Sequence, residues 1–358
     1  MTTLTGAADV RGGGTPSPAP VRLWLYGIAL LILAMIVVGG ATRLTDSGLS
    51  ITEWRPIHGT IPPLNEAEWQ EEFEKYRQIP EYQLINRGMT LEAFKEIFWW
   101  EWAHRFLGRF IGVAFFVPLV WFWATGRIGR SLAPQLAGIF VLGGLQGAVG
   151  WWMVASGLAE RTDVSQYRLA VHLTLAFAIY ALVIWVAQGL APRAPVAGGG
   201  ETRGRTLALV LLVLLFVQVF LGGLVAGLDA GLVANTWPTM DGELIPHGLL
   251  VVEPWWRNAF ENPVTAQFDH RMIAYAILVV ALVHLVRQRG VQGAGGALVL
   301  FLVLLAQAAI GVATVVLEMP LHVALFHQFG AAVVVWVAVA HLRSLTPAPR
   351  FAPGLRPA

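Results

Sequence analysis

A glutamate and a histidine three residues apart, Glu101 and His104, stand where a charged segment meets a long apolar run. A spacing of three puts both side chains on one face of a helix. The apolar run, residues 104–124, is long enough to cross a membrane. An ionisable pair at the mouth of a membrane span is a candidate functional site, because charge inside a membrane is costly and is usually kept for a role.

Four of the nine histidines occupy matched positions in alternate apolar runs. His104 and His270 open their runs and are each followed by arginine, whereas His172 and His327 lie slightly deeper in theirs. Two histidines on facing helices at similar depth are typical axial ligands of one heme iron. A zinc ion needs three or four ligands at one point, so two per site are too few. The alternative for any single histidine is a hydrogen-bonded packing residue.

The two sets of histidines differ in one neighbouring residue. The position of Glu101 is taken by Gln267 in the second set, and an amide carries no charge and transfers no proton. A carboxylate one turn from an iron ligand could stabilise a cation or move protons, which favours the first set for chemistry and the second for a resident redox cofactor. The alternative is that Glu101 pairs with Arg105 or is a helix N-terminal charge.

The remaining polar residues of the apolar runs have plainer interpretations. Arg105, Arg168 and Arg271 lie beside the histidines and could bind heme propionates or equally extend to lipid phosphates. His284 and His341 are at helix ends and are expected to extend to the membrane surface. His58 and His247 are in loops without repeat partners, and the role of His322 stays open. Intramembrane amides usually hydrogen-bond between helices, which is the expectation for three glutamines, Gln146, Gln218 and Gln307.

The elements that position these residues are apolar helices. The 358 residues are 56% hydrophobic and only 13% charged, far from the composition of a soluble domain. Continuous runs of membrane-spanning length occur eight times, which favours helices over the alternating pattern of a β-barrel. They are residues 23–40, 104–124, 136–155, 169–188, 207–227, 268–286, 298–316 and 321–342. The fold class is therefore an all-α polytopic membrane protein.

The chain repeats itself once. The first run ends in Gly39-Gly40, followed by Asp46, Gly48-Leu49 and Trp54, and the fifth run ends in the same residue types at one constant offset. Each half then holds four spans and enters the membrane from the same side. We expect two four-helix bundles related by a pseudo-two-fold axis along the membrane normal.

Charge and composition divide the chain further. We expect a disordered cytoplasmic tail at 1–21, an N-terminal half at 22–190 with a large extracytoplasmic loop at 44–102, a cytoplasmic linker at 191–206, a C-terminal half at 207–343 and a cytoplasmic tail at 344–358. Asp9 and Glu201 are the only acids on the arginine-rich side, which predicts that both termini are cytoplasmic. In the large loop, Asn65 and Thr90 are expected to cap helices, with Phe94, Ile97 and Phe98 of the second helix facing the membrane.

Together these residues identify the chain as similar to the heme A synthase family over nearly its whole length. The matching motifs are Gly-Leu-Ser-Ile-Thr-Glu-Trp at 48–54, Phe-Trp-Trp-Glu-Trp-Ala-His-Arg at 98–105, Asp-Ala-Gly-Leu at 229–232 with Asn-Thr-Trp-Pro at 235–238, Phe-Asp-His-Arg at 268–271 and Phe-His-Gln at 326–328. The loops resemble the mitochondrial-type branch. Some members carry a cysteine pair in outer loops, and this chain has no cysteine, so a thiol-based transfer step is excluded.

The resemblance implies an activity that spacing alone does not give. Members oxidise a methyl group of heme O to a formyl group by two successive hydroxylations, with water as the oxygen source, to give heme A for terminal oxidases. Carried over by motif, His270 and His327 would ligate heme b as cofactor, and His104 and His172 would hold the substrate heme. Glu101 would be the catalytic carboxylate.

The resemblance also implies partners and a location. Heme O synthase, a membrane prenyltransferase, is an expected partner beside an unknown electron acceptor and the lipid bilayer, with a possible homo-oligomer and no nucleic acid. The location would be the inner (plasma) membrane. Two alternatives stay open. A diheme b-type membrane cytochrome for quinone-linked electron transfer needs the same four histidines but no asymmetric glutamate. The other alternative is a non-catalytic heme chaperone. The heme entry route and the permanence of ligation by His104 and His172 stay open.

Overall fold

Eight long helices lie side by side and account for most of the computed structural model, which describes residues 18–55, 58–191, 201–291 and 293–347. They are α1 Ala19–Leu44, α4 Leu91–Ala124, α5 Ala133–Val154, α6 Gln166–Gly189, α7 Glu201–Gly227, α9 Pro263–Arg287, α10 Ala294–Val316 and α11 Leu321–Ser344. All eight are long and apolar enough to span a membrane. The prediction of an all-α polytopic membrane protein with eight spans is confirmed.

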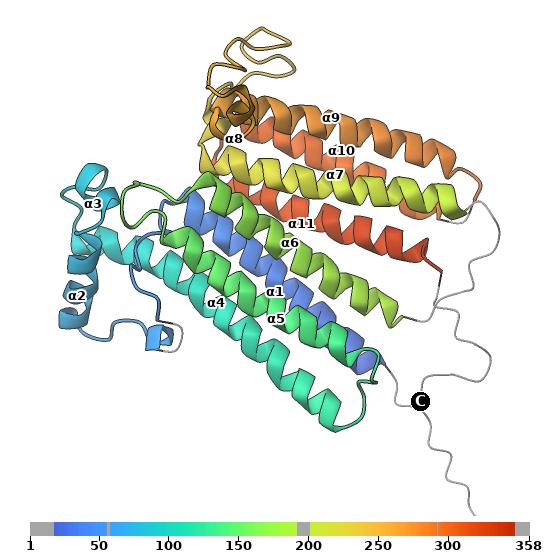
Figure 1. Ribbon diagram of the computed structural model, residues 1–358, viewed down its shortest axis with the longest axis horizontal. Coiled ribbons are helices and arrows are strands. Elements are labelled where there is room, and N and C mark those ends of the chain that lie inside the picture. Colours follow the sequence, from blue (N-terminus) through green and yellow to red (C-terminus); the bar gives the residue numbers. More distant parts are fainter. Residues whose placement is uncertain (1–17, 56–57, 192–200, 292, 348–358) are drawn as a thin grey trace, which may run out of the picture.

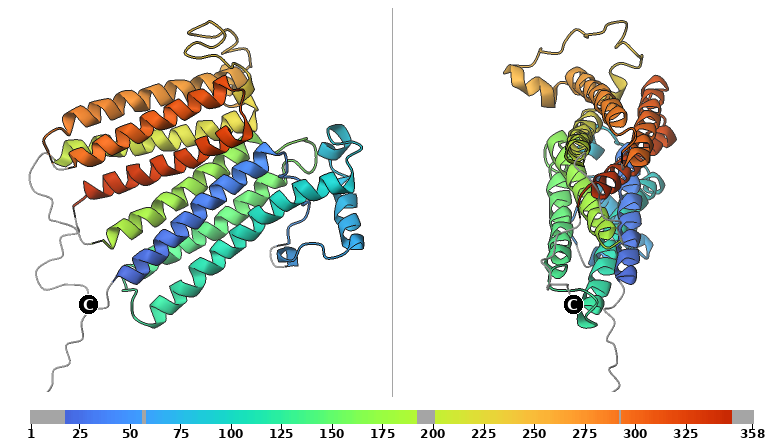
Figure 2. Two further views of the ribbon diagram at one scale, coloured as in Figure 1. Left: turned by 180° about the vertical axis from the view of Figure 1, so that it is seen from behind. Right: turned by 90° about the vertical axis from the view of Figure 1, so that its right-hand side faces the viewer.

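The two long loops, residues 45–90 and 228–262, gather at one end of the helices (Figures 1 and 2). The first loop forms the short elements η1 His58–Thr60, α2 Glu66–Tyr76 and α3 Pro80–Leu84. The second forms η2 Ala230–Leu232, η3 Trp255–Arg257 and α8 Asn258–Glu261. The start of α1 and the end of α11 lie at the opposite end, as an even number of spans requires.

The predicted caps and loop helices are partly right. Asn65 accepts a hydrogen bond from the Glu68 N–H at 3.0 Å and begins α2, and Thr90 accepts one from the Ala93 N–H at 3.3 Å and begins α4. However, α4 runs without a break from the loop into the span. The expectation that Phe94 and Phe98 face the membrane is wrong, because both are buried against the α2 side of the loop, where aromatic rings cover them.

The predicted segment boundaries are only partly covered. Residues 1–17 of the N-terminal tail, 192–200 of the linker and 348–358 of the C-terminal tail lie outside the described residues. α7 begins at Glu201, within the segment 191–206 that we predicted as a linker. The division at 22–190 and 207–343 stays a prediction.

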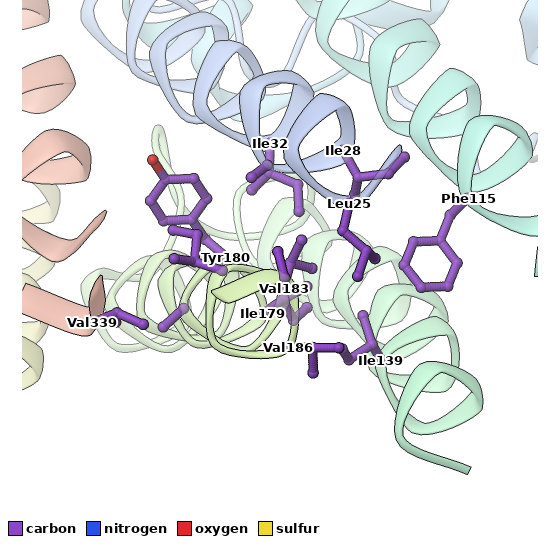
Figure 3. Close-up of a cluster of buried hydrophobic side chains, with 14 of the residues drawn as sticks. Leu25, Ile28, Ile32, Phe115, Ile139, Ile179, Tyr180, Val183, Val186 and Val339 are labelled. Atoms are coloured by element: carbon purple, nitrogen blue, oxygen red, sulfur yellow. The ribbon is translucent and has the colours of Figure 1, made fainter. Parts of the chain in front are cut away.

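The apolar core joins the helices of each half. Residues of α1, α4, α5 and α6 form one buried cluster, to which α11 contributes Val335 and Val339 (Figure 3). Ile32 of α1 lies on the side of Tyr180 of α6, whereas Leu25 and Ile28 lie on the side of Phe115 of α4. A second cluster joins α7, α9, α10 and α11 and includes Leu211. α11 therefore contributes buried residues to the apolar clusters of both halves.

Small residues bring the two halves into close contact. Gly223 of α7 lies so near α6 that a Cβ there would stand 2.6 Å from the Cα of Ala170, and a Cβ at Gly227 would meet the Gln166 Cα at the same distance. Such approach of helix backbones is how membrane helices gain packing energy without a hydrophobic drive. On the other side, Gln328 of α11 reaches across Gly40 of α1.

The repeat has a geometric counterpart where α1 and α7 end. Asp46 and Asp229, which correspond in the repeat, both adopt the left-handed conformation with φ of 48°. Arg43 lies between them and forms ion pairs with Asp46 at 3.0 Å and Asp229 at 2.8 Å. One arginine therefore joins the two corresponding turns. The pseudo-two-fold relation of whole bundles stays a prediction.

Candidate functional site

Each of the four predicted histidines packs against a glycine of the neighbouring helix. A Cβ added to that glycine would lie between 2.9 and 3.2 Å from an imidazole atom, so only glycine allows the approach. The pairs are His104 with Gly39, His172 with Gly150, His270 with Gly222 and His327 with Gly311. All four imidazoles keep some exposed surface although they lie between helices.

The histidines come together in two pairs, as the repeat predicts. His104 lies within electrostatic reach of His172, and His270 within reach of His327. Among the described residues no group of three or more His, Cys, Asp or Glu side chains is arranged around one point. Two imidazoles brought near each other from different helices fit the donor set of a heme iron, which binds histidine nitrogens.

Three of the histidines are held by a glutamine, a contact that we did not predict. Gln146, Gln218 and Gln307 each donate from Nε2 to the backbone carbonyl oxygen of their histidine, at 3.1, 3.0 and 2.8 Å. The same nitrogen lies 3.1 or 3.2 Å from the histidine Nδ1. The general expectation that these amides bond between helices is confirmed, and their partners are the candidate ligands themselves.

Glu101 is almost fully buried, at 2% exposure, and its carboxylate accepts hydrogen bonds from several donors. Oε2 accepts from the Ser50 hydroxyl at 2.8 Å and from the Ile51 N–H at 2.7 Å, and Oε1 forms an ion pair with Arg105 at 2.6 Å. The contact with Arg105 is the alternative considered from the sequence. The Arg105 guanidinium compensates this carboxylate, as a buried carboxylate requires.

The corresponding residue of the C-terminal half has the opposite polarity. Gln267 is buried and donates from Nε2 to the carbonyl oxygens of Ala234 at 3.1 Å and Gly231 at 3.3 Å. The residue at the repeat position of Ser50 is Val233, which has no hydroxyl to donate. The halves therefore differ at two positions, Ser50 against Val233 and Glu101 against Gln267. The N-terminal half has a carboxylate acceptor where the C-terminal half has an amide donor.

Arg105 and Arg271 do the same task in the two halves. Each guanidinium donates to backbone carbonyl oxygens of a loop, which follows α1 for Arg105 and α7 for Arg271. Arg105 donates to Ile51 at 2.7 Å and Glu53 at 2.9 Å. Arg271 donates to the corresponding residues, Ala234 at 2.8 Å and Thr236 at 2.9 Å, and also to Thr239 at 3.4 Å. Both arginines thus fix the loop after α1 or α7 to the helix that carries the neighbouring histidine. Arg168 donates to the Trp152 carbonyl at 2.6 Å and lies over the Trp152 ring. Contact with propionates stays a prediction for all three.

Known proteins match this chain over most of its length. The model of the COX15-CtaA family, described as cytochrome oxidase assembly protein, matches residues 22–339. The chain belongs to this family. Curated relatives named heme A synthase are 56% identical in Mesorhizobium japonicum and Chelativorans sp., and 55% identical in Brucella anthropi. Each alignment covers 90 or 91% of both chains.

One sequence-based interpretation of this COX15-CtaA family member is wrong. His284 and His341 do not extend to the membrane surface but are buried, at 1% and 4% exposure, with their Nε2 atoms 2.8 Å apart. One imidazole donates and the other accepts, since each neutral ring has one N–H. They lie at the ends of α9 and α11, and their separation in the sequence gives no signal that the two rings meet. His322 is exposed at the start of α11.

Proposed function

We propose that this membrane oxidoreductase is a heme A synthase, which converts heme O to heme A. The observation that carries the proposal is the pair of histidine sites of which only one has a buried carboxylate, Glu101. Curated relatives with this name are 54–56% identical over about nine-tenths of the chain. Heme O as the substrate and the lipid bilayer as the surroundings follow from the name and from the eight apolar helices.

The two halves take different hemes in this proposal. His270 and His327 would hold heme b as the resident cofactor, which supplies a one-electron redox centre when bound. His104 and His172 would hold heme O as substrate. The support for this division is that Glu101 is a hydrogen-bond acceptor beside His104, whereas Gln267 is a donor beside His270.

The reaction needs an oxidation and a source of oxygen. Two successive hydroxylations convert the methyl group to a formyl group. The net reaction consumes one water molecule and releases equal numbers of protons and electrons. The second hydroxylation gives a geminal diol, which loses water. Glu101, held in place by Ser50 and Arg105, would stabilise positive charge on the carbon that is oxidised or accept a proton from the attacking water. The electrons would pass to an acceptor that is not identified.

Replacement of the carboxylate tests the proposal directly. Glu101→Gln keeps the shape but has no charge, so heme A formation should fall by about a hundredfold or more, the usual range for a lost acid–base group. The full chain is expressed with a supply of heme O, and its extracted pigments are separated. Gln267→Glu is the matched control, because it adds a carboxylate at the repeat position of the other half.

The outcome separates the alternatives. The heme b spectrum of Glu101→Gln should be retained. If the unaltered protein yields heme b but no heme A and no oxidised intermediate, the proposal is wrong. A diheme cytochrome would then reduce or oxidise a quinone, and a chaperone would carry heme O unchanged.

The cellular setting is part of the same proposal. The bacterial relatives support a multi-pass protein of the plasma membrane. Both termini would be cytoplasmic, and both histidine pairs would lie toward the outer side. Heme O synthase is the expected partner, because it makes the substrate in the same membrane, and a homo-oligomer is a further possibility that pull-down and mass measurement of the purified protein test.

A further inference from the structure

The helix beside each candidate histidine presents two residues one turn apart. The second is the contacting glycine, and the first, four positions earlier, lies on the same helix face. The four sets are Gln146 and Gly150, Gln218 and Gly222, Gln307 and Gly311, and Met35 and Gly39. Three histidines therefore contact an amide and a glycine. His104 contacts a glycine, and the residue at the amide position is Met35, whose Cε lies against Gly108, one turn beyond His104.

The amide restrains both the backbone and the ring of its histidine. The Gln218 Nε2 donates to the His270 carbonyl oxygen at 3.0 Å and lies 3.2 and 3.1 Å from the two ring nitrogens. Nearly equal distances to both nitrogens place the amide over the face of the imidazole, because a position in the ring plane at that distance would collide with Cε1. Gln146 is placed in the same way over His172.

The ring of His104 is turned differently from the other three. In His172, His270 and His327 the ring atom that a Cβ on the facing glycine would meet first is Cε1, at 2.9 to 3.2 Å, followed by Nδ1. In His104 the first atom is Nε2, at 3.0 Å, followed by Cδ2. His104, which has no amide partner, is thus also the histidine that presents the Nε2 and Cδ2 edge of its ring to the glycine. No hydrogen bond holds its imidazole within the described part of the chain.

Resting on the proposed function, we propose that Gln146, Gln218 and Gln307 are positioning residues for permanent iron ligands and that Met35 leaves His104 as the exchangeable ligand. A resident cofactor needs two fixed ligands, and the C-terminal half has an amide at each. A substrate heme must enter and its product must leave, and the N-terminal half has an amide at His172 alone. Residues that orient a ligand from outside commonly change metal affinity by about tenfold to a hundredfold.

Heme transfer to an acceptor measures this difference. The purified full chain, loaded with heme b and heme O, is mixed with excess apomyoglobin. The amounts of heme b and heme O bound to the apomyoglobin are then measured over time. Met35→Gln supplies the missing amide and should slow the loss of heme O by about tenfold. Met35→Leu is the control of similar size without an amide, and it should lose heme O at the unaltered rate.

The reciprocal variant tests the C-terminal half. Gln218→Met should speed the loss of heme b by about tenfold and should change the low-spin electron paramagnetic resonance signal of that heme, since the ring of His270 is freed to turn. Unchanged transfer rates in both Met35→Gln and Gln218→Met would overturn the proposal. So would equal slowing by Met35→Gln and Met35→Leu, because the amide would then not be the cause.

Failure of this inference is distinct from failure of the proposed function. Transfer rates need no turnover, so a protein that forms no heme A but holds heme O longer in Met35→Gln contradicts only the synthase assignment. Normal heme A formation with unchanged transfer rates contradicts only the inference.

Discussion

The glycine that faces each histidine sets how the imidazole can sit. In α10, a methyl group at position 311 would stand 2.9 Å from the His327 Cε1, closer than real side-chain contacts allow. We predict that Gly311→Ala displaces the ring and lowers the heme b content of the purified protein by about tenfold, as loss of ligand orientation does. Gly295→Ala in the same helix is the control, because nothing lies within 4 Å of its Cβ. Equal heme content in both variants would contradict the prediction.

A buried acid of the outer loop, Glu81 in α3, should make stability depend on pH. Burial raises the pKa of its carboxyl from 4.5 to about 8, and repulsion from Asp46 and Glu101 adds to the shift, whereas a hydrogen bond with Tyr76 opposes it. Its Oε2 has no hydrogen-bond partner. Between pH 4.5 and about 8, the folded chain keeps a proton on Glu81 that the unfolded chain releases. The free energy of unfolding therefore falls as pH rises through this window.

Removal of the acid should abolish that pH dependence. At pH 8 we expect Glu81→Gln to unfold at a higher temperature than the unaltered protein. Its free energy of unfolding should be higher by about 1–2 kcal/mol, a common size for a single substitution. Near pH 5 the two should agree, because the acid is then largely protonated in the folded state. Thermal unfolding in detergent at both pH values is the measurement, with the exposed Glu160→Gln as control. A Tm difference between Glu81→Gln and the unaltered protein that is the same at both pH values would contradict the prediction.

The sequence predicted which residues form the candidate site, but it did not predict the contacts between them. The histidines were found because their repeat positions are matched, and the Glu101 difference was visible for the same reason. The amides over three histidines and the meeting of His284 with His341 were not found, since both depend on which helices are neighbours and how they are rotated. Apolar composition that suits every face of a membrane helix gives no periodic signal for that rotation.

At the scale of helices, the contact of α6 with α7 joins the two halves. Gly223 approaches the backbone of Ala170, which cannot move aside as a flexible side chain would. We predict that Gly223→Leu separates the helices and lowers the free energy of unfolding by about 1–3 kcal/mol, the usual cost of overpacking. Thermal unfolding in detergent measures this, with Gly143→Leu in α5 as control because its Cβ would meet open space. Similar Tm values for the two variants would be inconsistent with a tight interface.

Local signals in the outer loop were predicted well, and its packing was not. Asn65 and Thr90 begin helices because a short polar side chain can accept from the free N–H groups of the first turn. Phe94 and Phe98 lie in an apolar stretch before a span, so the sequence favoured the membrane as their surroundings. They are buried instead because α2 presents Trp69 and Phe73 to the same face of α4.

For the whole molecule, the absence of cysteine makes topology easy to test. Single cysteines can be introduced without removing others. We predict that Glu160→Cys, between α5 and α6, reacts with a membrane-impermeant maleimide in intact cells, whereas Arg130→Cys, between α4 and α5, reacts only after the membrane is opened. Arginine-rich connections are retained on the cytoplasmic side. The reverse labelling pattern would mean that the orientation predicted from charge is wrong.

The side chain of Gln328 has a consequence for electron flow. It directly follows His327 in α11, and its amide donates to the Ile36 carbonyl oxygen of α1 at 2.8 Å. Ile36 lies beside Met35 on the helix that carries Gly39, so one hydrogen bond joins the backbone around one candidate iron site to the backbone around the other. Electrons tunnel more readily along bonded atoms than across gaps. In the proposed function, a bonded path along which electrons would pass between the two halves therefore ends one peptide bond from His327.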